Sequence, residues 1–143
     1  MIVGYTTGVF DMFHIGHLNI IRSAKMKCDY LLVGVSSDQL VEEQKNVKLI
    51  TPYHERADLV ASIRYVDEVI PQNSFDKMVV WKQKKFDRMF VGNDWKGSER
   101  WTKLEQEFQP LGVEIMYLPY TKNISSTHLR KFIEDNYANY DHT

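Results

Sequence analysis

The segment Thr6–His17 reads TTGVFDMFHIGH and joins an expected first strand to an expected first helix. Gly8 and Gly16 allow the backbone to approach a ligand closely. A helix that starts near His17 would offer free N–H groups and a partial positive charge at its N-terminus, and both favour phosphate. The segment therefore predicts an anion-binding loop between a strand and a helix.

Two imidazoles lie in this segment, at His14 and His17. A spacing of three at a helix start places them on the same side, where they could donate hydrogen bonds to an α-phosphate in its transition state. They could also be ordinary polar residues at a helix entry. A zinc site is a third interpretation, although no acidic or cysteine ligand lies at a matching spacing.

Short β-branched runs alternate along the chain with longer stretches of helical periodicity. This alternation is typical of parallel strands joined by crossover helices, so we expect an α/β fold. One domain should span 1–143, with 138–143 as a disordered tail. The expected strands are 2–5, 30–35, 68–70, 88–91 and 113–118. The first expected helix begins near residue 17. Further helices are expected at 52–64, 74–85, 98–108 and 125–137.

Composition favours a globular protein with a small-molecule ligand. The chain has 143 residues, 43% of them hydrophobic, and its net charge of −1 argues against nucleic acid or anionic membrane as a partner. The lone Cys28 excludes an intramolecular disulfide and favours a reducing cytoplasm. No run approaches the ~18 apolar residues of a membrane span, and the N-terminus does not resemble a secretory signal.

Ligands of open α/β sheets bind at the carboxyl ends of the strands, which here are followed by loops 6–17, 36–52, 92–97 and 119–127. Lys45 and Lys48 lie in the second loop, which we expect to be mobile. Their ammonium groups suit phosphate capture, although two surface lysines could equally be solubilising charges.

The last two loops also carry candidate ligand-binding groups. Asp94 could bind Mg²⁺ or a nucleotide, and Trp95 offers a flat apolar wall. Asp11 is a weaker metal candidate whose alternative role is to fix the loop after the first strand. The hydroxyls of 125–127 could hold β- and γ-phosphates or simply cap the last helix.

GVFDMFHIGH closely resembles the G-x-F-D-x-x-H-x-G-H signature of the nucleotidyltransferase superfamily, and specifically of its cytidylyltransferase branch. SIRYVDEVIP at 62–71 and VGNDWKG at 91–97 are similar to segments of the same branch. LPYTKNISSTHLRK at 118–131 resembles the R-T-E-G-I-S-T-T motif of glycerol-3-phosphate cytidylyltransferases. The resemblance covers about residues 5–132. Class I aminoacyl-tRNA synthetases share H-x-G-H, but this chain is too short for one and has no K-M-S-K-S segment.

The resemblance implies a Rossmann-like domain with a five-stranded parallel sheet, and a homodimer with the segment around Arg64 and Tyr65 at the subunit contact. It also implies transfer of a cytidylyl group from CTP, with Mg²⁺, to a phosphorylated alcohol. Glycerol 3-phosphate is the leading acceptor, which would give CDP-glycerol and pyrophosphate. The residues assigned to catalysis are His14, His17 and Lys45. Those assigned to the acceptor are Lys45, Lys48, Arg64 and Lys77, and those assigned to the metal are Asp94 and Asp11. The residues assigned to the nucleotide are Gly8, Val9, Phe10, Asp11, His14, Gly16, His17, Asp94, Trp95, Tyr120, Thr121, Ile124, Ser125, Ser126 and Thr127.

Departures from the family motifs keep other activities open. Tyr120 replaces an arginine, Lys122 a glutamate, Asn123 a glycine and Ser126 a threonine, and Asn93 replaces an acidic residue. Lys122 could restore the charge lost at position 120. The I-S-S-T-x-x-R pattern is shared with adenylyltransferases of the superfamily. The alternatives are therefore a phosphocholine or phosphoethanolamine cytidylyltransferase, an adenylyltransferase of FAD or coenzyme A synthesis, and a non-catalytic nucleotide-binding regulator.

Overall fold

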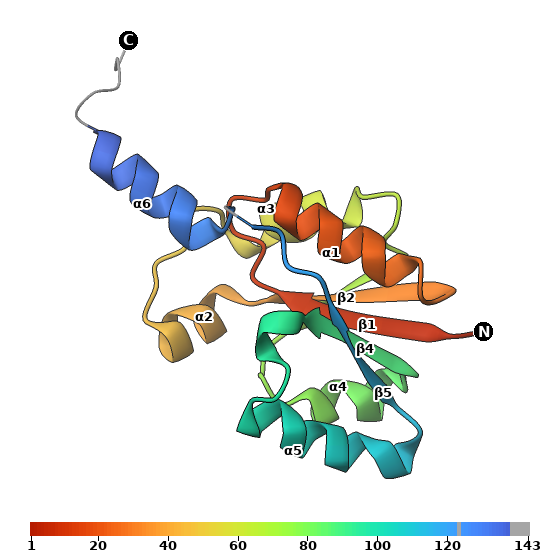
Figure 1. Ribbon diagram of the computed structural model, residues 1–143. Helices are drawn as coiled ribbons and strands as arrows, with labels where there is room; N and C mark the ends of the chain where they lie inside the picture. Colours follow the sequence, from red (N-terminus) through yellow and green to blue (C-terminus); the bar gives the residue numbers. More distant parts are fainter. Residues whose placement is uncertain (123, 138–143) are drawn as a thin grey trace.

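The computed structural model describes residues 1–122 and 124–137, so the expectations for Asn123 and for the tail at 138–143 lie outside the described residues. Its strands are β1 (Val3–Gly8), β2 (Tyr30–Ser36), β3 (Glu68–Gln72), β4 (Arg88–Gly92) and β5 (Glu114–Leu118). All strand pairs are parallel, and the order is β3-β2-β1-β4-β5. The predicted α/β fold with a five-stranded parallel sheet is confirmed (Figure 1).

Helices cover both faces of the sheet (Figure 1). Helices α1 (Ile15–Lys25) and α3 (Tyr53–Ala61) lie on one face, and α4 (Lys77–Lys84) and α5 (Glu99–Phe108) lie on the other. The remaining elements are α2 (Asp38–Lys45), α6 (Ser126–Asn136) and the short 3₁₀ turns η1 (Asn93–Trp95) and η2 (Gln109–Leu111). Helix α6 projects from the body of the domain, and its N-terminus lies at the carboxyl end of the sheet.

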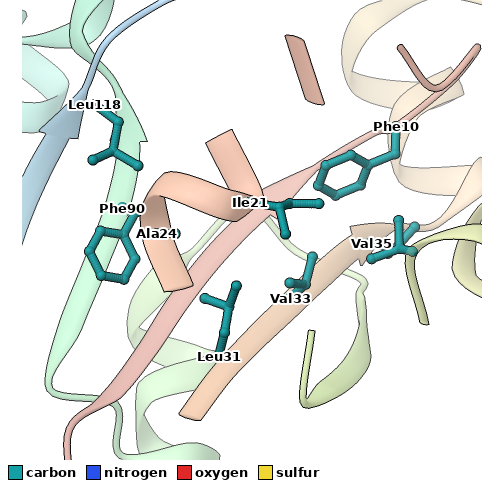
Figure 2. Close-up of a cluster of buried hydrophobic side chains, with 9 residues drawn as sticks. Phe10, Ile21, Ala24, Leu31, Val33, Val35, Phe90 and Leu118 are labelled. Atoms are coloured by element: carbon teal, nitrogen blue, oxygen red, sulfur yellow. The ribbon is translucent and has the colours of Figure 1, made fainter. Parts of the chain in front are cut away.

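The interior strand β2 contributes to a buried core on each face. Leu31 and Val33 belong to one cluster with Ile21 of α1, which Figure 2 shows in close-up. Leu32 lies between them in sequence and belongs to a second cluster with Phe108 of α5. A parallel strand that is buried on both faces reads as a continuous apolar run, as 30–35 does. The core thus fills both faces and leaves the carboxyl edge for ligands.

Three differences from the expected elements bear on the site. Strand β1 extends to Gly8, because its pairing with β2 continues to the pair Gly8–Val35. Helix α1 begins at Ile15, two residues early, because the His14 side chain caps it. Helix α2 forms within the loop expected at 36–52, because Ser37 Oγ accepts from the Leu40 N–H and Leu40 is buried. Lys45 therefore ends a helix, and the expectation that it lies in a loop is wrong.

The chain order creates a switch point between β1 and β4. After β1 the chain adds β2 and β3 on one side, and it then returns to place β4 against the other side of β1. Crevices at such switch points bind ligands in open α/β sheets. No helix in 1–122 or 124–137 is long and apolar enough to span a bilayer.

Candidate active site

A cleft of about 540 Å³ opens at this switch point. Its walls come from the chain after β1 and β4 and from the N-terminal ends of α1 and α6. Its volume lies in the range of pockets that enclose a small organic ligand. Every residue that the sequence assigned to the nucleotide lines this cleft, as does Lys45: Gly8, Val9, Phe10, Asp11, His14, Gly16, His17, Asp94, Trp95, Tyr120, Thr121, Ile124, Ser125, Ser126 and Thr127.

His14 and His17 act together as the N-terminal cap of α1. Nδ1 of His14 accepts a hydrogen bond from the Gly16 N–H at 3.0 Å, and Nδ1 of His17 accepts from the His14 N–H at 3.2 Å. The two rings stack with centroids 3.8 Å apart. A neutral imidazole whose Nδ1 accepts a hydrogen bond carries its proton on Nε2. Both rings are thereby held as Nε2–H donors beside the cleft.

The neutral form of both histidines is favoured at pH 7. Burial, and to a lesser extent the neighbouring His14, lower the pKa of His17 to about 4, while the Asp11 charge opposes this shift. Burial also lowers the pKa of His14. With both Nδ1 atoms engaged, and no cluster of three or more metal-ligating side chains in 1–122 and 124–137, the zinc interpretation loses its support. The residues are better suited to donate hydrogen bonds than to bind a metal.

The loop after β1 is shaped to bring these rings to the cleft. Phe10 and Met12 both have left-handed backbone angles, with φ of 57° and 49°, so the chain turns sharply on either side of Asp11. A Cβ on Gly16 would lie 2.8 Å from Cε1 of His14. Only glycine at this position lets the imidazole fold back over the first turn of α1.

Asp11 holds the loop rather than a ligand. It is 1% exposed, and its carboxylate accepts from the N–H groups of Ile50 at 3.0 Å and Thr51 at 2.9 Å and forms an ion pair with Arg130. Burial would raise the pKa of Asp11, but these three partners outweigh it and keep the pKa below the usual range. Both carboxylate oxygens are engaged, so the structure favours the fixing role and disfavours the metal assignment.

Arg130 is a cleft residue that the sequence analysis did not assign. It lies on α6, lines the cleft beside Asp11, and buries an Nε without a hydrogen-bond partner among the described residues. The only sequence signal for it was the last position of I-S-S-T-x-x-R. Tyr120 lines the cleft but Lys122 does not. The cleft therefore receives a guanidinium from α6, and Lys122 does not line it to replace the charge lost at position 120.

The N-terminus of α6 faces the cleft with its cap in place. Ser125 Oγ accepts from the His128 N–H at 3.0 Å, and Ser126 Oγ donates to the Asp11 carbonyl. Asn19 Nδ2 of α1 donates to Thr121 Oγ1 at 3.0 Å and fixes the preceding loop. The capping interpretation holds, and the positive end of the helix dipole still points at the cleft. Two helix N-termini thus meet at one site.

Of the four residues assigned to the acceptor, only Lys45 lines the cleft. Lys45, Val47 and Leu49 line the cleft and Lys48 does not, because alternate residues after α2 face it. Arg64 does not line the cleft either. Helix α3 starts near the cleft and runs toward the amino ends of the strands, and Arg64 follows its far end. There the Arg64 guanidinium donates to the Tyr65 hydroxyl at 2.9 Å.

Lys77 lies behind the cleft wall. It is 6% exposed, and its Nζ donates to Gln72 Oε1 at 3.0 Å and to Thr7 Oγ1 at 3.3 Å. Thr7 lines the cleft, so Lys77 touches the site through it. Burial, followed by the charges of Arg100 and Lys45, lowers the pKa of Lys77 to about 8.

One carboxylate at the cleft fits a Mg²⁺–nucleotide complex. Asp94 lies on η1, is exposed and lines the cleft together with Trp95. Mg²⁺ is commonly held by one or two carboxylates together with substrate phosphates and water. A single exposed carboxylate is therefore sufficient, and Asp94 meets this requirement where Asp11 does not.

The low pKa of His17 predicts a pH-dependent stability. Unfolded His17 has a pKa near 6.5, so between pH 6.5 and about 4 the unfolded chain binds more protons than the folded one. Its contribution to the free energy of unfolding is therefore present above pH 6.5 and lost as the pH falls toward 4. Urea unfolding measures the free energy of unfolding at pH 7 and at pH 4.5. The decrease between these two pH values should be smaller in His17→Gln than in the unchanged protein, by about 2 kcal/mol. The exposed His54→Gln should keep the full effect, and equal effects in all three proteins would contradict the assignment.

Two imidazole donors, two helix N-termini and Arg130 favour chemistry at a nucleotide phosphate. Fold and site together define the class of protein, which is a Rossmann-like nucleotidyltransferase with its cleft between β1 and β4. The family model of cytidylyltransferase-like proteins matches residues 5–132. The chain therefore belongs to the cytidylyltransferase-like family.

Individual relatives differ in nucleotide and acceptor. The chain is 37% identical over 127 residues to a glycerol-3-phosphate cytidylyltransferase of Bacillus spizizenii, covering 88% of this chain and 92% of the relative. It is 31% identical over 130 residues to an FAD synthase of Thermococcus sibiricus, covering 90% of this chain and 88% of the relative. Among solved structures, a lipopolysaccharide core biosynthesis protein of Thermoplasma volcanium matches with a TM-score of 0.71 and 27% identity, covering 87% of this chain and 99% of that chain.

Proposed function

We propose that the chain transfers a cytidylyl group from CTP to glycerol 3-phosphate, giving CDP-glycerol and pyrophosphate. The observation that carries this proposal is the pair of imidazoles held as Nε2–H donors at the N-terminus of α1. The similarity to a glycerol-3-phosphate cytidylyltransferase over 88% of the chain supports the choice of nucleotide and acceptor.

The reaction needs stabilisation of charge more than proton transfer. A phosphate oxygen of the acceptor attacks the α-phosphorus of CTP and forms a new P–O bond, while the bond to the β-phosphate oxygen breaks and pyrophosphate leaves. A phosphate monoester is already an anion at neutral pH, so no strong base is required. His14 and His17 donate hydrogen bonds to the α-phosphate, and the N-termini of α1 and α6 stabilise the negative charge.

Cations complete the proposed site. Lys45 reaches the cleft from the end of α2, and Arg130 reaches it from α6. We propose Asp94 as the protein ligand of Mg²⁺ bound with the triphosphate; the ion would supply positive charge to the phosphates. The fixed positions of these groups orient both substrates, and positioning of this kind contributes a large part of rate enhancement in two-substrate reactions.

A panel of nucleoside triphosphates, each with glycerol 3-phosphate and Mg²⁺, tests the proposal through pyrophosphate release. We expect release with CTP. Release with ATP in its place would instead support an adenylyltransferase, a second candidate favoured by Arg130 in the I-S-S-T-x-x-R pattern and by the similarity to an FAD synthase. Tight binding of a triphosphate without turnover would favour a nucleotide-binding regulator.

Tyr120→Arg should strengthen CTP binding. Tyr120 is 53% exposed at the cleft, just before the N-terminal end of α6, where a guanidinium could make bidentate bonds to phosphate. We expect a gain of about 1–2 kcal/mol, close to the worth of one hydrogen bond to a charged group. Calorimetric titration of CTP measures it, with Tyr120→Phe as the control for loss of the hydroxyl alone. Weaker binding by the arginine variant would show that the Tyr120 ring itself contacts a ligand.

We also propose a homodimer in a reducing cytoplasm. The dimer rests on the resemblance of the segment 64–71 to the subunit contact of the family, and the reducing compartment is suggested by the single Cys28. Light scattering at micromolar concentration should give twice the 16.9 kDa mass of one chain. The mass of a single chain would refute the dimer.

A further inference from the structure

A second cavity lies behind the wall of the cleft, between α4 and α5. Its volume is about 320 Å³. Phe75 and Lys77 line it from the start of α4, and Arg100 and Trp101 line it from the first turn of α5. These segments follow β3 and β4, so the cavity also lies toward the carboxyl edge of the sheet.

Three cations from three helices lie near one another beside these cavities. Nζ of Lys45 and Nζ of Lys77 each lie 5.7 Å from the centroid of the Phe75 ring, on which both ammonium groups converge. Arg100 lies close enough for its charge to lower the pKa of both lysines, after the effect of their burial. The cluster is held together by the fold in spite of its mutual repulsion.

Nearby carboxylates leave this charge largely uncompensated. Within 1–122 and 124–137, no ion pair joins Lys45, Lys77 or Arg100 to an acidic side chain. Asp76 adjoins Lys77 and opposes the lowering of its pKa, but its Oδ1 accepts from the Met78 N–H as the cap of α4. Glu107 and Lys103 line the second cavity as well, and their opposite charges offset each other. Cations gathered in a concave site without ion-pair partners are suited to an anionic ligand.

The cluster is in contact with the proposed reaction site. Lys45 itself lines the cleft, and Lys77 donates to the cleft residue Thr7. Two of the three protons on the Lys77 ammonium are directed to Thr7 and Gln72, which leaves one donor for a ligand. Arg100 brings a planar set of donors that matches a phosphate.

The family resemblance already assigns Lys45 and Lys77 to the acceptor. We propose that Arg100 joins them in binding the acceptor phosphate and is a specificity-determining residue. This inference rests on the proposed function. An ammonium group a few ångströms from that phosphate would be repelled by the same cations. The acceptor class is therefore the phosphate ester of an uncharged polyol, and phosphocholine and phosphoethanolamine are disfavoured.

Direct binding tests the subsite without any nucleotide. Calorimetric titration should show that Arg100→Gln weakens binding of glycerol 3-phosphate, and of inorganic phosphate, by about tenfold or more. The matched control is Lys82→Gln, an exposed residue on α4 whose loss changes the net charge equally. A loss below about threefold in Arg100→Gln, or an equal loss in Lys82→Gln, would overturn the proposal. Because CTP is not present, a failure of the proposed function does not affect this result.

Kinetics separate the acceptor phosphate from the triphosphate of CTP. Arg100→Gln should raise KM for glycerol 3-phosphate by about tenfold with KM for CTP nearly unchanged. Arg100→Gln should also lower the ratio of kcat/KM for glycerol 3-phosphate to kcat/KM for phosphoethanolamine, because the Arg100 charge no longer repels the ammonium group of phosphoethanolamine. A rise in KM for CTP with KM for glycerol 3-phosphate unchanged would assign the cluster to the nucleotide and refute the inference.

Discussion

His14→Ala and His17→Ala should each lower the turnover of cytidylyl transfer by about 10²–10³-fold, the usual cost of removing one preorganised donor from a transition state. Each imidazole is fixed by a hydrogen bond through Nδ1, and the two rings stack at 3.8 Å, so no reorganisation is needed when the α-phosphate arrives. Pyrophosphate release at saturating CTP and acceptor measures the effect. Near-normal turnover in either variant would exclude the donor role of that residue.

The cap of α1 complicates this test, because loss of a helix cap costs about 1 kcal/mol of stability. His14→Asn separates the two roles, since an asparagine oxygen can still accept from the Gly16 N–H while the Nε2–H donor is lost. We expect this variant to unfold at nearly the normal urea concentration and still to lose most of its turnover. His54→Ala, an exposed histidine on α3, should change neither quantity. A His14→Asn protein with full activity would show that the cap is all that His14 provides.

The nucleotide site was predictable because its residues lie in short loops next to the strands. Thr6–His17 contributes both imidazoles from one continuous segment, and the hydroxyls of 125–127 contribute from another. In a parallel sheet the carboxyl ends of all strands meet at one edge, so correct strand assignment was enough to bring these loops together. The sequence could not reveal that both carboxylate oxygens of Asp11 are engaged, because its partners are 39 or more residues away.

The acceptor side was less predictable because it depends on helices and their directions. Helix α2 is short and mostly polar, with Leu40 and Val41 as its buried residues, so its periodicity was too weak to detect. Arg64 was expected at the pocket, but the direction of α3 carries it to the other edge of the sheet. Arg100 approaches Lys77 through the packing of two helices, which no local pattern encodes.

Arg56→Met should lower the free energy of unfolding by about 3–5 kcal/mol, because several buried or partly buried acceptors lose their donor at about 1–3 kcal/mol each. Arg56 is fully buried, and its Nη1 donates to the carbonyls of Val9 at 2.6 Å and Ser36 at 2.8 Å. Its Nε donates to the Thr51 carbonyl at 2.9 Å, and its Nη2 pairs with Asp38 at 2.6 Å. Methionine keeps most of the volume but leaves these acceptors without a donor.

The same contacts join the segments that shape the cleft, because Val9 follows β1, Ser36 ends β2 and Thr51 precedes α3. Arg56→Lys keeps the charge but loses the planar set of donors, so it should recover only part of the stability. Arg64→Met, which removes an exposed arginine, should cost less than about 0.5 kcal/mol. Urea unfolding of the three variants ranks them. If Arg56→Lys were as stable as the unchanged protein, a single ammonium would suffice, and the geometry of the guanidinium would not be what holds the ends of β1 and β2 together at the cleft.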